Sequence, residues 1–149
     1  MAKLFRQLTP FGPLRETLKS VVMSFHKFQP MPEYNTAETP GWLLLREILA
    51  TWIRESPCPV LLMPLPHDSV LSEASDPRKY QARFSEVARD TGCHVYDPLP
   101  ELLRLPLAER SELWSAAYWH YSAHGHEVLA RLLQPQVQKF MDSRARVPA

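Results

Sequence analysis

Apolar residues recur at spacings of three and four residues along most of this chain, which is the period of an amphipathic helix. The pattern predicts four principal helices, at residues 13–28, 42–55, 77–91 and 122–141. Pro13 suits the first position of its helix, and Gly92 suits the residue that ends the third helix. Pro135 is expected to kink the last one. Two shorter helices are predicted at 99–104 and 107–114.

Two short apolar runs between these helices predict strands. The first, Cys-Pro-Val-Leu-Leu-Met-Pro-Leu-Pro at 58–66, is typical of a strand buried on both faces, and the second covers 93–98. Helices that alternate with buried strands predict an α/β domain with a parallel sheet. Because two strands do not make a stable sheet, residues 3–9 or a loop segment would supply another, or the chain belongs to a larger fold. Residues 29–41 and 67–75 are expected to be loops.

Length and charge set the class of protein. At 149 residues the chain fits a single domain, in which residues 1–41 carry the fewest signals and 142–149 are expected to form a frayed tail. The 17 basic and 16 acidic side chains give a net charge of +1, so no nucleic-acid footprint is visible. No apolar run is long enough to predict a membrane span. Basic residues interrupt the apolar stretches near Met1, so no secretory signal is expected and the cytoplasm is the default compartment.

Scarce glycine and cysteine narrow the candidate chemistry. With 4 glycines and 15 prolines, the chain contains no glycine-rich phosphate loop, and no cofactor is expected. The two cysteines, Cys58 and Cys93, do not make a disulfide framework. Both stand at the starts of predicted strands and are expected to be buried and inert.

The most informative segment reads Tyr-Trp-His-Tyr-Ser-Ala-His-Gly-His, at residues 118–126. Ser122 is a typical N-cap for the helix that follows. This places His120 on a loop at the start of that helix, where catalytic groups tend to lie. An imidazole there could act as a general base near neutral pH. A structural role for His120 is the alternative.

This segment resembles the C-terminal block of the SGNH (GDSL-type) hydrolases, in which a histidine precedes a small-residue turn, Gly-His and an apolar helix. The strand VLLMPLP, the helix with YQARFSEVA and the segment HVYDPLPELL follow in the family's order, and the resemblance covers roughly residues 42–135. It implies a flavodoxin-like three-layer α/β/α sandwich, complete or incomplete, and hydrolysis of esters through a serine nucleophile. His120 would match the catalytic histidine, and His126 the structural histidine of the Gly-His pair.

Three parts of that family's machinery have no counterpart in this sequence. No Gly-Asp-Ser occurs to supply the nucleophile, and no Gly-x-Asn-Asp occurs to hold the oxyanion, since Asn35 is the only asparagine. The acid that orients the histidine would fall at Tyr118 or Ala117, and neither is a carboxylate. The chain therefore resembles the C-terminal half of a family member without its nucleophile.

Two polar residues after the predicted strands are further candidates. Ser69, in His-Asp-Ser, follows the first strand as a nucleophile would, although a polar turn is the simpler interpretation. Asp97 ends the second strand at the edge where ligands bind in open α/β folds, or it caps the helix that begins near Leu99. Of the two interpretations of Asp97, the cap is favoured.

Two clusters near the last helix have competing explanations. Zinc could bind three histidines, but the helix start at Ser122 separates the first two, so no metal site is expected at His120, His124 and His126. The aromatic residues before this helix would line a substrate pocket, join the core or form a contact surface; they are Trp114, Tyr118, Trp119 and Tyr121.

Two functions follow from these patterns. The first is ester hydrolysis of the esterase or deacetylase type, with His120 as general base, an unidentified serine nucleophile, and an ester or acetylated small molecule or glycan as substrate. The second is a catalytically inactive scaffold or interaction domain derived from the same family. An incomplete sheet would leave one edge uncovered, which predicts self-association through that edge.

Overall fold

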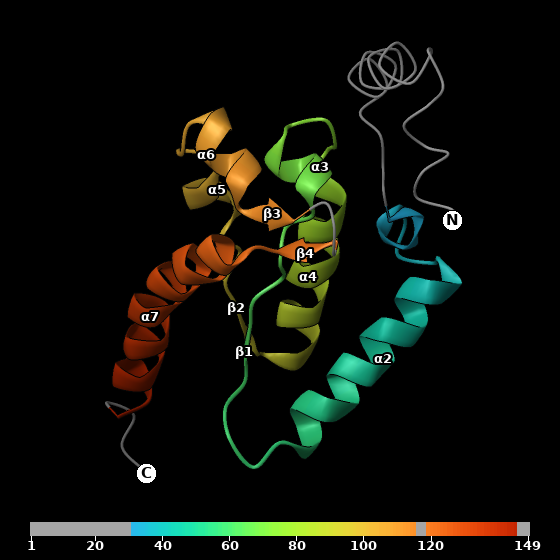
Figure 1. Ribbon diagram of the computed structural model, residues 1–149. Helices are drawn as coiled ribbons and strands as arrows, with labels where there is room; N and C mark the ends of the chain where they lie inside the picture. Colours follow the sequence, from blue (N-terminus) through green and yellow to red (C-terminus); the bar gives the residue numbers. More distant parts are fainter. Residues whose placement is uncertain (1–30, 116–118, 146–149) are drawn as a thin grey trace, which may run out of the picture.

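The computed structural model describes residues 31–115 and 119–145. The helix predicted at 13–28, the candidate strand at 3–9 and Tyr118 therefore lie outside the described residues. The elements, in chain order, are η2 (Pro32–Tyr34), α2 (Pro40–Glu55), β1 (Leu61–Leu62), α3 (Asp68–Leu71), α4 (Arg78–Thr91), β2 (His94–Val95), α5 (Leu99–Leu102), α6 (Leu107–Glu112), β3 (Trp114–Ser115), β4 (His120–Tyr121) and α7 (Ala123–Ala145) (Figure 1).

The predicted parallel pairing of the two apolar runs is confirmed. β1 and β2 lie side by side in parallel, with Leu61 opposite His94 and Leu62 opposite Val95. The ladder continues by a hydrogen bond from the Tyr96 amide to the Leu62 carbonyl at 2.8 Å. Each strand is only two residues long, much shorter than predicted. Prolines bracket β1 on both sides and have no amide to donate to a ladder, which explains its length.

Helices cover the two strands from opposite sides. Figure 1 shows β1 and β2 between α7 on one side and α2 with α4 on the other. The side chains of Trp42, Leu62 and Val87 form one buried cluster beneath α2 and α4. A second cluster joins the helices α3 and α5 to the start of α7; its most buried members include Leu71, Leu99, Leu102 and Leu113. The described chain is thus loosely α/β, mostly helical, with four short strands in two small sheets.

Two helices have capping residues where the sequence indicated, one at the end of α4 and one at the start of α7. Gly92 follows α4 with φ of 69°, a left-handed conformation that glycine adopts without strain, and its amide donates to the Ala88 carbonyl. Ser122 precedes α7, and its hydroxyl accepts a hydrogen bond from the Gly125 amide at 3.0 Å. No helix in the described part of the chain is both long and apolar enough to cross a membrane.

Several local predictions are wrong. Residues 67–75 were expected to be a loop but contain α3, and residues 29–41 contain the short helix η2. Of the frayed tail expected at 142–149, residues 142–145 form the end of α7, and residues 146–149 lie outside the described residues. Cys58, expected to be buried, is exposed, and Cys93 is half-buried. The antiparallel hairpin of β3 and β4 had no sequence signal, since each strand has only two residues.

Gly125, in the Gly-His pair, lies where α7 closely approaches the backbone just before β3. A Cβ atom at Gly125 would overlap the carbonyl oxygen of Leu113 and lie 2.9 Å from Cδ1 of Tyr121. Both neighbours are buried and cannot move without opening the second cluster. The α7 helix can therefore dock on the hairpin only with glycine at this position.

Gly125→Ala is expected to lower the free energy of unfolding by about 3 kcal/mol, as overpacking against backbone does. Gly41→Ala is the matched control, because a Cβ there would meet only the flexible Glu33 side chain, at 2.7 Å from its Cγ. That control should change stability by less than about 1 kcal/mol. Urea denaturation of the three proteins measures both values, and equal stabilities would contradict the close approach.

Candidate functional site

Three parts of the chain meet at the carboxyl ends of β1 and β2: the segment after β1, the segment after β2, and the β3–β4 hairpin. In Figure 1 the short helices α3, α5 and α6 and the β3–β4 hairpin all lie at this end of the strands. The Tyr121 hydroxyl donates a hydrogen bond to the Pro66 carbonyl at 2.7 Å. The Trp114 ring lies 5.2 Å from the His67 ring and 5.4 Å from the Tyr121 ring, measured between centroids. These contacts hold the hairpin beside the residues that follow β1.

His120 is carried to this end of the molecule by β4. It lies opposite Ser115 in the hairpin, and its side chain is exposed. The expected loop is therefore a strand, although the helix start immediately after it is as predicted. No hydrogen bond or ion pair joins the His120 ring to another side chain in the described ranges. The position expected to hold an orienting acid, Tyr118, lies outside those ranges.

Ser69 does not meet His120 and instead takes part in a local cap. Its hydroxyl lies 3.0 Å from Nδ1 of His67, and its amide donates to the same nitrogen at 3.2 Å. The Ser69 side chain is buried, with 7% of the residue exposed. His67 is thus the N-cap of α3. Local hydrogen bonding explains Ser69, but in the first turn of a short helix rather than in the expected polar turn.

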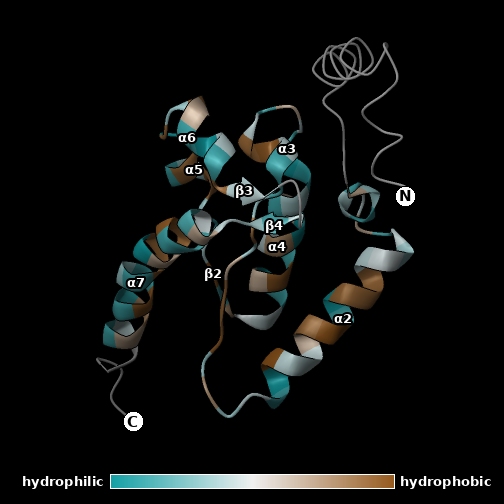
Figure 2. Ribbon diagram, viewed as in Figure 1, coloured by the Kyte–Doolittle hydropathy of each residue, from teal (hydrophilic) through white to brown (hydrophobic). Residues whose placement is uncertain are grey.

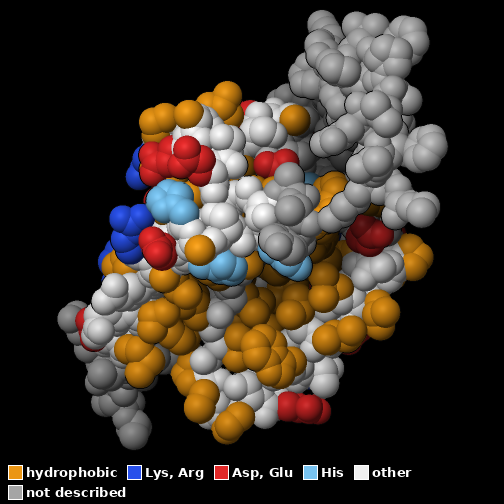
Figure 3. Space-filling model, viewed as in Figure 1, with side chains coloured by type: hydrophobic (Ala, Val, Ile, Leu, Met, Phe, Trp, Pro, Cys, Tyr) orange, Lys and Arg blue, Asp and Glu red, His pale blue; other side chains and the backbone are white. Residues whose placement is uncertain are grey.

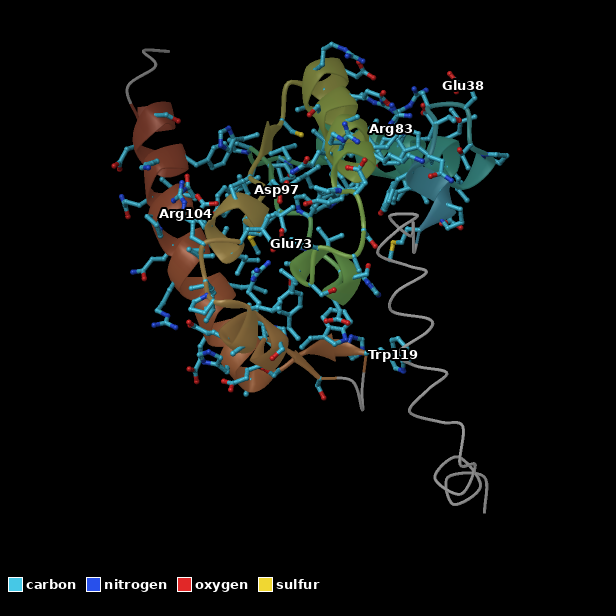
Figure 4. All side chains as sticks on the ribbon, turned by 90° about the horizontal axis from the view of Figure 1, so that it is seen from above. Glu38, Glu73, Arg83, Asp97, Arg104 and Trp119 are labelled. Atoms are coloured by element: carbon cyan, nitrogen blue, oxygen red, sulfur yellow. The ribbon has the colours of Figure 1, made fainter. Side chains whose placement is uncertain are left out.

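Asp97 serves as a helix cap and as the centre of a polar cluster. Its carboxylate accepts hydrogen bonds from the Leu99 amide at 3.0 Å, from the Tyr80 hydroxyl at 3.0 and 3.1 Å, and from Nε2 of Gln81 at 2.7 Å. The favoured capping interpretation is confirmed. Figure 4 shows Asp97 in the middle of the molecule when this end is viewed from above. Hydrogen bonds from three groups of the fold therefore already occupy the Asp97 carboxylate.

Burial and this carboxylate act together on two tyrosines. Burial, followed by the charge of Asp97, raises the pKa of the Tyr80 hydroxyl well above the ordinary value of 10.0. The same two causes, in the same order, raise the pKa of Tyr121. Both hydroxyls therefore act as hydrogen-bond donors rather than as bases near neutral pH.

The remaining candidates are not brought into one site. Within residues 31–115 and 119–145, no group of three or more histidine, cysteine or acidic side chains is arranged to hold a metal ion. His126 lies against the Tyr121 ring, with centroids 6.2 Å apart. Trp119 is 70% exposed and stands at the outside of the molecule, whereas Trp114 and Tyr121 pack into the second cluster. Asn35 accepts a hydrogen bond from Lys79.

One residue that sequence reasoning missed is His67. It lines a cavity of about 130 Å³ at the carboxyl end of β1, together with Tyr34, Val70, Phe84 and three residues of the Pro-Leu-Pro turn that precedes it. In the sequence His67 looks like part of a polar turn. Only the packing of η2 and α4 beside this end of β1 gives it a cavity to line.

Alkaline pH tests the polar cluster. In the unfolded chain tyrosines ionise near 10.0, while folded Tyr80 and Tyr121 keep their protons to higher pH. The unfolded state then binds fewer protons, so the free energy of unfolding is expected to fall as pH rises above about 10. Tyr80→Phe should make this fall shallower, measured by urea denaturation between about pH 8 and about pH 11.5. An unchanged slope would argue against the raised pKa of Tyr80.

Comparisons with known proteins leave the family open. Neither a scan of family models nor searches of curated proteins and of solved structures produced a match to this chain.

Proposed function

We propose that this chain carries the histidine-bearing half of an SGNH-type ester-hydrolysing site, with His120 as general base. The observation that supports the proposal most is the position of His120: it lies two residues before Ser122, which caps α7, and next to Tyr121, whose hydroxyl bonds to the Pro66 carbonyl after β1. In a flavodoxin-like three-layer fold, β1 and β2 would be the last two strands of the sheet. The helices α2 and α4 would form one outer layer, and α7 the other.

The proposed reaction assigns one proton-transfer role to His120. Its imidazole takes the proton of a serine hydroxyl as the oxygen attacks the ester carbonyl, and then gives that proton to the departing alcohol. Water then attacks the acyl group on the serine. His120 takes a proton from this water and gives it to the departing serine oxygen, which releases the acid. The substrate is an ester or an acetylated small molecule or glycan. No described serine hydroxyl bonds to His120, so the serine nucleophile is not identified.

A fluorophosphonate probe tests this function, since it labels only an activated serine. The folded wild-type chain is expected to gain the mass of one adduct, and His120→Ala is expected to lose it. His94→Ala is the matched control, because His94 is an exposed strand histidine on β2 and should leave labelling unchanged. Absence of an adduct on folded wild-type protein would reject ester hydrolysis by this chain.

A second candidate function, a non-catalytic interaction domain, is favoured by the open edge of β1. Val60 and Leu62 supply the carbonyls that bond to β2, so the alternation of a parallel ladder turns the peptide groups of Leu61 toward the other edge. No described strand pairs with that edge. Beside it, α2 exposes Leu44, Ile48 and Trp52, which are 65%, 56% and 55% accessible to solvent.

The partner proposed for this surface is a second copy of the chain. Figure 2 shows the hydrophobic colour along α2, and Figure 3 shows hydrophobic side chains gathered on the face between α7 and α2. Antiparallel pairing of β1 with its own copy would join two marginal two-stranded sheets into one of four strands. A two-fold axis through that pair brings the same patch of each copy together.

Ile48→Glu is expected to convert a wild-type dimer to a monomer in sedimentation equilibrium, because it places a charge in the shared patch. Leu107→Glu is the matched control: Leu107 is 58% exposed, on α6, and should leave the dimer intact. A wild-type chain that stays monomeric at high micromolar concentration would reject self-association. A monomer produced equally by both variants would reject the assigned surface.

A further inference from the structure

A cavity of about 130 Å³ opens at the carboxyl end of β1, on the side of His67. Most of its wall is apolar and comes from elements far apart in the chain: Tyr34 from η2, Pro64 and Pro66 after β1, Val70 from α3 and Phe84 from α4. Tyr34 and Phe84 are held by ring contacts to each other and to buried Trp42. The cavity is therefore built on packed side chains.

His67 gives this cavity a hydrogen-bond donor of fixed direction. The Ser69 amide donates to Nδ1 at 3.2 Å, and an amide can only donate, so Nδ1 of the neutral ring carries no proton. The proton must then reside on Nε2. The Trp114 ring, 5.2 Å away between centroids, braces the other side of the imidazole. Nε2 has no partner among the described residues, and its N–H is free for a ligand.

Size and charge define what the cavity can accept. An apolar protein cavity of about 150 Å³ holds one benzene molecule, so this cavity suits about five or six non-hydrogen atoms. The Asp76 carboxylate also lines it, 2.6 Å from its partner Arg78. No described lysine or arginine lines the cavity, so a carboxylate ligand would lose its water without gaining a positive partner in the wall, which disfavours it. The matching ligand is small, mostly apolar, neutral, and equipped with one acceptor oxygen.

We propose that this cavity binds a short neutral acyl group, whose carbonyl oxygen accepts a hydrogen bond from Nε2–H of His67. The identification of the acyl group as part of an ester substrate depends on the function proposed above. Binding itself does not, because His67 holds the carbonyl and His120 takes no part in it. In an ester-hydrolysing site, His67 would hold the carbonyl oxygen, and the volume of the cavity would select acyl groups of about four carbons over longer ones.

Butyramide is the probe for this proposal, because it has the required acyl group and does not hydrolyse. Titration into protein labelled with ¹⁵N-histidine is expected to shift the His67 Nε2 resonance and to saturate at millimolar concentration. Butyrate, of the same size but charged, should leave the resonance unchanged. Absence of a butyramide shift, or an equal response to butyrate, would overturn the proposal.

Four variants separate the contributions of the site. Leu65→Trp should fill the cavity from a 51% exposed position and abolish binding. His67→Ala, which lacks the reporting resonance and is therefore titrated by calorimetry, should bind butyramide about fivefold more weakly, the effect of one neutral hydrogen bond, with folding checked by circular dichroism. Ser69→Ala retains the amide that fixes Nδ1 and should bind butyramide normally. Unaltered affinity in Leu65→Trp would contradict the assigned cavity.

The fourth variant, His120→Ala, distinguishes this proposal from ester hydrolysis. It should bind butyramide as tightly as wild type while losing any fluorophosphonate labelling. Binding without labelling of wild type would reject the hydrolase and retain the acyl cavity. Fluorophosphonate labelling of wild type without butyramide binding would reject the acyl cavity and retain the hydrolase.

Discussion

The hydrogen bond from the Tyr121 hydroxyl to the Pro66 carbonyl connects parts of the chain that are 55 residues apart. Both the hydroxyl and the carbonyl are buried and lose their hydrogen bonds to water on folding. The bond between them replaces those lost hydrogen bonds. The bond fixes the β3–β4 hairpin against the turn that follows β1. Both histidines at this end depend on it, since His120 is adjacent to Tyr121 and His67 is adjacent to Pro66.

The two histidines are suited to different chemistry. His120 is exposed and has no partner within the described ranges that would fix its tautomer, so its chemistry depends on what approaches it. His67 is half-buried, and the Ser69 amide fixes its protonation pattern as a donor at Nε2. In the proposed ester hydrolysis, His120 would supply the base and His67 a hydrogen-bond donor at the same end of the parallel strands. No described side chain is assigned as the nucleophile.

The apolar face of α2 is wider than the surface that its described neighbours cover. Leu45, Leu49 and Ile53 pack with Trp42 against the first buried cluster, whereas Leu44, Ile48 and Trp52 are exposed. The apolar stripe of an amphipathic helix is expected to face other apolar side chains. The exposed apolar side chains of α2 are therefore expected to pack against residues other than 31–115 and 119–145, either of this chain or of another copy.

The sequence by itself determined the features that depend on near neighbours. Helical periodicity predicted α2, α4 and α7. The residue types at Gly92, Asp97 and Ser122 predicted caps of α4, α5 and α7, because a cap involves groups within a few positions. The order of apolar runs also predicted the parallel pairing of β1 and β2. Only the tertiary structure decided the rest. The β3–β4 hairpin, the exposure of Ile48 and the cavity at His67 depend on side chains tens of residues away, and no local pattern records which of those will meet.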